Sequence, residues 1–274
     1  MFSDPQSFGQ DFQLTLLTAD PVVAVEGERA GIQRIGVDIE RLGKAARQAG
    51  HDTRLSGHTW NDLSEIASAL RSSGIFIRLN PPHSGTAEEV EAAIEHGATI
   101  LMLPHFHTEI EAATFARFVK GRAYAMLLVE TPRAIVRIQE IAETKGIDEI
   151  MIGLNDLRLS MNLRGLEIVS SPLMSAIARV VRDNGKKFSF GGLGRHDDAT
   201  LPLNPDILYA QYPRLGATGA WLSRSFFRNP PADWTMEDGV KTLRERLSFW
   251  AGRSEHDLID ARDALALQSI RSEV

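Results

Sequence analysis

"YAMLLVETPRAIVRIQEIAETKGIDEIMIG", residues 124–153, contains the unit that decides the fold. A short apolar run rich in β-forming residues is followed by an amphipathic stretch and by a second apolar run. This order is typical of a strand, a helix and a second strand parallel to the first. Similar runs recur at residues 14–18, 34–39, 75–79, 99–104, 124–130, 149–153, 187–192 and 218–223. Eight strands with intervening helices predict an α/β fold, and they favour a closed (β/α)8 TIM barrel over an open doubly wound sheet.

Start and stop signals predict helices between the strands. Thr86 followed by Glu89 has the spacing of a capping box, and this helix is expected to stop at Gly97. Further helices are expected at residues 108–119, 131–146, 172–185 and about 235–252.

The last segment differs from the repeating pattern. We expect residues 1–254 to form the barrel and residues 255–274 to form an additional C-terminal helix. A covering surface is needed for its apolar positions, which are Leu258, Ile259, Leu265, Leu267 and Ile270. That surface could belong to the chain's own barrel. It could equally belong to a neighbouring subunit, if the subunits exchange this helix.

Composition excludes several classes of protein. The chain has 274 residues, 43% hydrophobic and 24% charged, with a net charge of −6 and no cysteine. The sequence lacks the clustered Lys/Arg stripe that a nucleic-acid partner requires, so no such partner is expected. No apolar run approaches the ~18 residues of a membrane span. The N-terminal residues have no basic region followed by an apolar one, so a cytoplasmic protein without a membrane partner is expected.

Charged side chains come at the ends of four predicted strands. Asp38 and Glu40 end the second, Arg78 the third and Glu130 the fifth, while Asp156 follows the sixth. Because alternate residues of a barrel strand face inward and chemistry is carried at the carboxyl ends, these groups are expected at one rim. Each acid alone has an ordinary explanation, since helix starts favour Asp and Glu.

Glu130 and Asp156 come from adjacent strands, so their carboxylates could converge on one cation. Mg2+ and Mn2+ prefer hard oxygen ligands and would leave positions for a bidentate 2-oxo acid. Arg78 could then neutralise the enolate oxygen that develops when a carbon–carbon bond breaks. Asp38 and Glu40 would orient Arg78, a water or a loop.

Other residues near the rim have two interpretations. His105, in "PHFHT", could be a base or a substrate contact, or a solvated loop histidine. The loop of residues 49–60, with His51, Arg54 and His58, could cover the rim. Gly191, Gly192 and Gly194, with Arg195, could bind phosphate or only permit a tight turn. Arg214, Arg224 and the four tryptophans are expected in the core or at an interface.

The chain resembles the HpcH/HpaI aldolase and citrate lyase beta-subunit superfamily. The blocks that carry the resemblance are "GIQRIGVDIERLGKAARQAG", "IFIRLNP", "GATILMLPHFHTEIEAATFARFV" and "LLVETPRAIVRIQEIAETKGIDEIMIGLNDLRLSM". The resemblance implies a barrel in which Glu130 and Asp156 hold Mg2+, or Mn2+ or Co2+. It also implies that Arg78 contacts a pyruvate-type oxygen and that the amides around Leu154 and Asn155 receive the substrate carboxylate. Members are commonly trimers or hexamers, so a homo-oligomer is expected.

The sequence departs from the family pattern at two positions. Family aldolases carry an acid–base histidine where this chain has Arg41, and many carry a glutamine where it has Leu128. Arginine stays protonated and cannot remove a hydroxyl proton, so either another base acts or the reaction differs. The citrate-lyase-like branch also lacks that histidine, and "DIERLGKAARQ" is similar to its pattern.

The first hypothesis is a divalent-metal-dependent carbon–carbon lyase or aldolase that acts on a 2-oxo acid through an enolate stabilised by the metal and Arg78. A second is a non-catalytic relative that binds metal and oxo acid. A third is a lyase or synthase that uses an acyl-CoA or phosphoenolpyruvate. The presence of all three of Glu130, Asp156 and Arg78 favours chemistry over binding alone.

Overall fold

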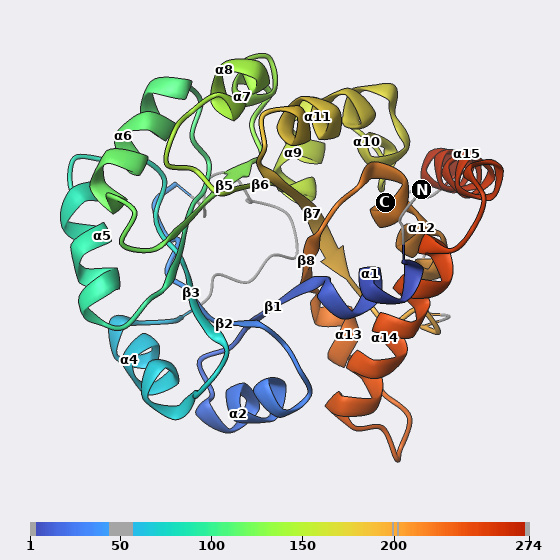
Figure 1. Cartoon of the computed structure of the whole chain (residues 1–274), viewed down its shortest axis with the longest axis horizontal. Helices are drawn as coiled ribbons and strands as arrows, with labels where there is room; N and C mark the ends of the chain where they lie inside the picture. The colour runs from blue at the N-terminus through green and yellow to red at the C-terminus, as the bar shows by residue number, and fades with distance from the viewer. Residues whose placement is uncertain (1–3, 44–56, 199, 202, 272–274) are drawn as a thin grey trace.

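Eight parallel strands close into a barrel in sequence order, with β8 paired to β1 (Figure 1). The computed structural model describes residues 4–43, 57–198, 200–201 and 203–271. The strands are β1 (Gln13–Leu17), β2 (Arg34–Asp38), β3 (Gly74–Arg78), β4 (Ile100–Leu103), β5 (Tyr124–Val129), β6 (Glu149–Ile152), β7 (Lys187–Leu193) and β8 (Gly219–Leu222). The predicted TIM barrel is confirmed.

Helices surround the barrel and follow most strands. They are α1 (Pro5–Asp11), α2 (Pro21–Arg29), α4 (Trp60–Ala69), α5 (Thr86–Glu95), α6 (Glu109–Val119), α7 (Pro132–Ile135), α8 (Ile138–Ala142), α9 (Leu154–Met161), α10 (Glu167–Ser170), α11 (Pro172–Asp183), α12 (Pro205–Leu215), α13 (Arg224–Phe227), α14 (Met236–Ala251) and α15 (Glu255–Arg271). Among the described residues, none of these helices is long and apolar enough to cross a membrane.

The prediction of one helix over residues 131–146 was wrong. The segment is divided into α7 and α8, because the amide of Arg137 donates to the carbonyl of Ala134 and so tightens the turn between them. Arg137, the N-cap of α8, has a φ of −110° and so leaves the helical region.

The capping box predicted at Thr86 was also wrong. Gly85 is the N-cap of α5, and the hydroxyl of Thr86 exchanges hydrogen bonds with the backbone of His83. Glu89 instead accepts hydrogen bonds from the backbone and the side chain of Asn80. Capping boxes form at Thr59 before α4 and at Thr108 before α6.

The barrel interior is filled in layers. Apolar side chains occupy the middle, and they are Phe76, Ile100, Met102, Met126, Leu128 and Met151. Below them, at the amino-terminal end, the guanidinium of Arg34 lies 2.7 Å from the carboxylate of Glu149, which also accepts from Tyr124 and Ser189. Above them, at the carboxyl end, lie Asp38 and Arg78 in register with each other. The filled middle therefore leaves the carboxyl-terminal rim as the place for a site.

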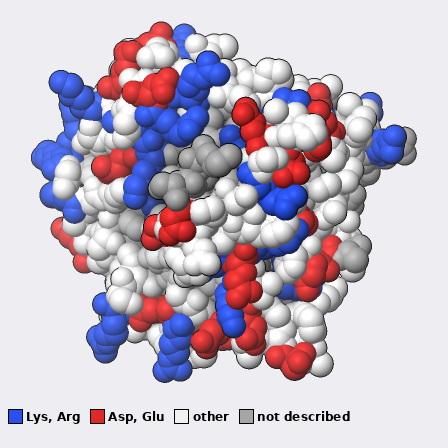
Figure 2. Space-filling model, turned by 45° about the vertical axis from the view of Figure 1, so that its right-hand side comes forward, with Lys and Arg blue, Asp and Glu red and all other residues white. Residues whose placement is uncertain are grey.

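The C-terminal helix α15 packs on α12 and α10 of its own chain. Leu265 is fully buried there, whereas Leu267 and Ile270 each remain 57% exposed. The chain's own barrel therefore covers part of the apolar face, and exchange with a neighbouring subunit stays a prediction. Figure 2 shows Lys and Arg side chains interspersed with Asp and Glu on the visible face, so the net charge of −6 is not gathered in one patch there.

Candidate metal and substrate site

A cavity of about 730 Å³ opens at the carboxyl ends of the strands. Residues from both sides of the barrel mouth line it. Asp38 and Arg78 come from β2 and β3, and Gly191 and Ser223 come from β7 and from the position after β8. Of the residues predicted for the site, six line it, namely Asp38, Arg78, Glu130, Leu154, Asn155 and Asp156. In the part of the chain that the structure describes, Glu40 and His105 are not part of this wall.

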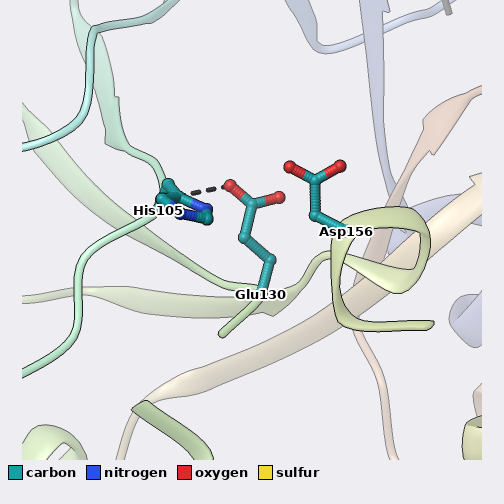
Figure 3. A group of neighbouring side chains, drawn as sticks. All are labelled: His105, Glu130 and Asp156. Carbon is teal, nitrogen blue, oxygen red and sulfur yellow. Dashed lines mark hydrogen bonds between the residues drawn. The ribbon is translucent and has the colours of Figure 1, made fainter. Parts of the chain in front are cut away.

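His105, Glu130 and Asp156 form one cluster at the edge of the cavity. One ligand atom of each residue lies within 4.8 Å of those of the other two. Figure 3 shows the imidazole of His105 on one side of the Glu130 carboxylate and the carboxylate of Asp156 on the other. The predicted convergence of Glu130 and Asp156 is therefore observed, and His105 adds a nitrogen donor beside them.

Gly153 makes room for Glu130. A side chain at position 153 would meet Cβ of Glu130 at 2.8 Å and its carboxylate at 2.7 Å. Gly153 is the N-cap of α9, and Asp156 lies in the first turn, so Asp156 is not the N-cap residue of this helix. The carboxylate of Asp156 therefore lies both in the cluster and near the positive end of the helix dipole.

His105 holds Glu130 through its backbone. The amide of His105 donates a hydrogen bond to Oε1 of Glu130 at 3.1 Å. His105 has a φ of 48°, a left-handed conformation that is uncommon for residues other than glycine. Its ring makes an edge contact with His107, at 5.4 Å between centroids. The turn after β4 therefore fixes both the backbone donor and the ring beside the carboxylate.

Arg78 is held by two acids and a tryptophan. Its guanidinium forms two hydrogen bonds with Asp38, at 2.9 and 2.6 Å, and lies 3.4 Å from the carboxylate of Glu40. It also lies 4.9 Å from the ring of Trp221. Burial lowers the pKa of Arg78, but the nearby carboxylates, Asp38 first, raise it above its ordinary value. Arg78 is therefore a fixed positive charge, oriented by Asp38 and by the fully buried Glu40.

Leu154 and Asn155 line the cavity in the first turn of α9. Gly191 has a φ of +56°, and a side chain there would meet Leu154 at 2.5 Å, so the glycine permits the close approach of α9 to β7. Gly191 and Gly192 line the cavity. Arg195 instead donates hydrogen bonds to the carbonyls of Phe226, Arg228 and Asn229, so it holds the backbone at the end of α13 and after it in place.

Two further residues at the end of β8 line the cavity. Trp221 packs against the apolar cluster inside the barrel, as expected, and also lines the cavity. Arg224 lines the cavity just after β8, and its expected position at an interface stays a prediction. Arg158, Phe227 and Ser223 also line it and carried no site prediction. Arg158 is four residues beyond Leu154, so helical spacing would have found it. Arg214 does pack, since it donates to Ser175 and to the carbonyl of Val169.

Arg41, at the family's histidine position, binds backbone. Its guanidinium donates to the carbonyls of His58 at 3.0 Å and of Gly57 at 3.5 Å. His58 lines the cavity, and its Nδ1 accepts from the amide of Asp38 at 3.0 Å. In a neutral His58 ring the proton is therefore on Nε2, so the ring is a donor there. His51 and Arg54 of the predicted covering loop lie outside the described residues.

Comparisons with known proteins agree with the fold. The family model described as HpcH/HpaI aldolase/citrate lyase matches residues 57–187. The chain is 22% identical over 234 residues to the 4-hydroxy-4-methyl-2-oxoglutarate aldolase cghB of Chaetomium globosum, covering 71% of this chain and 81% of that protein. It is 23% identical over 230 residues to the hydroxypyruvate/pyruvate aldolase of Paraburkholderia phytofirmans, covering 70% and 88%. The structure of CitE from Mycobacterium tuberculosis in complex with magnesium and pyruvate is similar at a TM-score of 0.56 and 17% identity, covering 93% of this chain and 97% of that one.

Proposed function

We propose, from the match of residues 57–187 to the HpcH/HpaI aldolase/citrate lyase family model, that the chain is a divalent-metal-dependent lyase that makes or breaks a carbon–carbon bond next to a 2-oxo acid. One observation carries the proposal. The His105, Glu130 and Asp156 cluster and the fixed guanidinium of Arg78 lie at one cavity at the carboxyl end of the barrel. A scaffold needs none of these groups there, whereas a metal-stabilised enolate needs a metal site and a nearby positive charge.

The donor set fits a hard divalent cation. Glu130 and Asp156 offer carboxylate oxygens, and His105 offers an imidazole nitrogen, which Mn2+ and Co2+ accept more readily than Mg2+. We assign Glu130 and Asp156 as the residues that would hold the ion, with His105 as a third donor or as a contact to the substrate. When bound, such an ion supplies Lewis-acid polarisation of the oxygens of the oxo acid.

The chain's own residues then have distinct roles. Arg78 stabilises the enolate oxygen, because its charge is fixed and it lines the same cavity as Glu130 and Asp156. Asp38 and Glu40 keep the guanidinium oriented. The amides at Leu154 and Asn155, in the first turn of α9, receive the carboxylate of the oxo acid.

The absence of the family's histidine at position 41 gives this site a different acid–base arrangement. Arg41 cannot accept a proton and instead holds the backbone at Gly57 and His58. His105 is the residue of the cluster whose ring can exchange a proton, and His58 is a donor. Interconversion of pyruvate and its enolate needs only proton transfer to and from the methyl carbon. This step therefore tests the metal cluster and Arg78 without a second substrate.

Exchange of the methyl protons of pyruvate in deuterium oxide tests this function. With Mg2+ or Mn2+ present, we expect exchange that is abolished by a chelator and reduced at least about a hundredfold in Glu130→Ala and in Asp156→Ala. Glu140→Ala, which changes an exposed glutamate on α8, is the matched control and should retain full exchange. Tight binding of pyruvate without exchange in the wild-type protein would contradict the proposal and favour a binding protein.

A further inference from the structure

Glu40 lies beyond the end of β2, and yet its carboxylate is buried beside Arg78. β2 ends at Asp38, which pairs in register with Arg78 at the end of β3. Glu40 is 1% exposed, and its carboxylate lies 3.4 Å from Nε of Arg78. Because the strand ends two residues earlier, the position of this carboxylate depends on the groups that hold the chain on either side of it.

Asn80 holds the chain immediately after Glu40. The side-chain oxygen of Asn80 accepts hydrogen bonds from the amide of Arg41, at 2.8 Å, and from the amide of Leu42, at 3.0 Å. Before them, the amide of Glu40 donates to the carboxylate of Asp38 at 3.1 Å. Glu40 is therefore held by Asp38 on one side and by Asn80 on the other.

Glu89, in the first turn of α5, determines which way the side-chain amide of Asn80 faces. The carboxylate of Glu89 accepts hydrogen bonds from Nδ2 of Asn80, at 2.6 Å, and from the backbone amide of Asn80, at 3.0 Å. An ionised carboxylate can only accept, and backbone amides can only donate. The nitrogen of Asn80 must therefore face Glu89, and its oxygen must face the chain after Glu40. An ionised aspartate at position 80 would instead place an oxygen against the carboxylate of Glu89.

We propose, on the basis of the proposed function, that Asn80 is a positioning residue for Arg78, which acts through Glu40 and is itself supported by Glu89. Asp38 binds two nitrogens of the guanidinium, and Glu40 is the second acid that approaches it. Without Asn80 the chain after Glu40 loosens, and the guanidinium keeps only one of its two anchors. Arg78 then stabilises the enolate oxygen less well, because such stabilisation depends on a charge that is already oriented before the reaction.

Substitution of Asn80 tests this role through the rate of pyruvate exchange at saturating pyruvate and Mn2+. We expect Asn80→Asp, which is nearly isosteric, to lower this rate by about tenfold, a typical effect of losing a partner that orients a group of the site. Asn80→Ala, which removes the hydrogen bonds without adding a charge, should cause a similar fall. Mn2+ affinity, measured by calorimetry, should not change in either variant, since the hydrogen bonds of Asn80 go to Glu89 and to the chain after Glu40 and not to the metal cluster.

A double variant provides the rescue. In Asn80→Asp/Glu89→Gln the acid and the amide exchange places, so the nitrogen at position 89 can donate to the carboxylate at position 80 and all the hydrogen bonds can form again. We expect this variant to recover most of the lost exchange rate. The matched control is Asn61→Asp on α4, because Asn61 also donates to a glutamate, Glu65, at 2.8 Å on the exposed surface. The control should exchange pyruvate at the wild-type rate.

The proton NMR signal of the Arg78 Nε–H group follows the guanidinium without turnover, and its loss in Arg78→Lys assigns it. We expect this signal to be changed in Asn80→Asp, restored in Asn80→Asp/Glu89→Gln and unchanged in Asn61→Asp. An unchanged signal and exchange rate in Asn80→Asp would overturn the proposal. So would a double variant as impaired as the single one, or a parallel loss of Mn2+ affinity, which would show a general disturbance of the barrel mouth. A signal that responds as expected in a protein that exchanges no pyruvate would reject the lyase and leave the positioning of Arg78 by Asn80 intact.

Discussion

Gly153 decides where the carboxylate of Glu130 lies. The hydrogen atom of the glycine faces both the Cβ and the carboxylate of Glu130, at distances that leave no space for a methyl group. Its φ of −81° is one that any residue adopts, so the requirement is for space and not for backbone freedom. A substitution here should therefore act on the metal cluster before it acts on the fold.

We expect Gly153→Ala to weaken Mn2+ binding by about tenfold or more, because a ligand displaced by a few tenths of an ångström loses its position in the cluster. The control is Gly252→Ala, since a side chain at Gly252 would make only ordinary contacts, at 3.5 Å or more. Mn2+ affinity measured by calorimetry, alongside urea unfolding, separates the two effects. Equal loss of affinity in both variants would contradict the steric role of Gly153.

Residue types and spacing predicted part of the site. Glu130, Asp156 and Arg78 were found because each ends or follows a strand, where the barrel brings side chains together. The function of Arg41 was not predictable, because its partners are two backbone carbonyls 16 and 17 residues further along the chain. The contact of His58 with Asp38 across 20 residues has the same cause. Pairings that arise from loop closure leave no local pattern.

At the scale of elements, strands were easier to predict than helix ends. All eight strands were placed within about one residue of the observed bounds, because β-rich apolar runs bounded by polar residues are a strong signal. Capping depends instead on which of several Thr and Gly residues starts the helix. Gly85 displaced Thr86 as the N-cap of α5, since the hydroxyl of Thr86 is used by the backbone of His83.

The capping box of α6 gives a prediction at this scale. The hydroxyl of Thr108 accepts from the amide of Glu111, and the carboxylate of Glu111 accepts from the amide of Thr108. We expect Thr108→Ala to lower the free energy of unfolding by about 1 kcal/mol. Thr114→Ala, within the same helix, should cause no comparable loss, because alanine is the better helix former there. Urea unfolding of both variants checks this difference.

At the scale of the whole molecule, the closed barrel encloses a buried ion pair at its amino-terminal end. Glu149 accepts from Arg34, Tyr124 and Ser189, and both members of the pair are almost fully buried. Burial raises the pKa of Glu149, but the charge and hydrogen bond of Arg34 outweigh it and lower the pKa below its ordinary value. Glu149 is therefore held as a carboxylate inside the barrel.

We expect Glu149→Gln to lower the free energy of unfolding by about 3 to 5 kcal/mol, because it leaves the buried charge of Arg34 without its partner. The double variant Arg34→Met/Glu149→Leu should recover most of that loss, since neither member then remains as an uncompensated charge. Chemical unfolding of the two variants and the wild-type protein provides the comparison. A double variant as unstable as the single one would show that the pair itself stabilises the barrel.

The dependence of stability on pH should reflect Glu28, whose carboxylate links α2 to the turn before β3. Partial burial raises its pKa, but hydrogen bonds from the amides of Ser72, Ser73 and Arg71 outweigh burial and lower it from 4.5 to about 2. The folded protein therefore binds this proton less readily than the unfolded chain. The stabilisation is complete above about pH 4.5 and is lost progressively as the pH falls toward 2. We expect the difference in free energy of unfolding between the wild-type protein and Glu28→Gln to be largest near pH 7 and to shrink below pH 4.5. The control is Glu245→Gln, on the exposed face of α14, which should differ little from the wild-type protein at any pH. A difference that stayed constant from pH 7 to 3 would show that Glu28 stabilises the turn through packing and not through its charge.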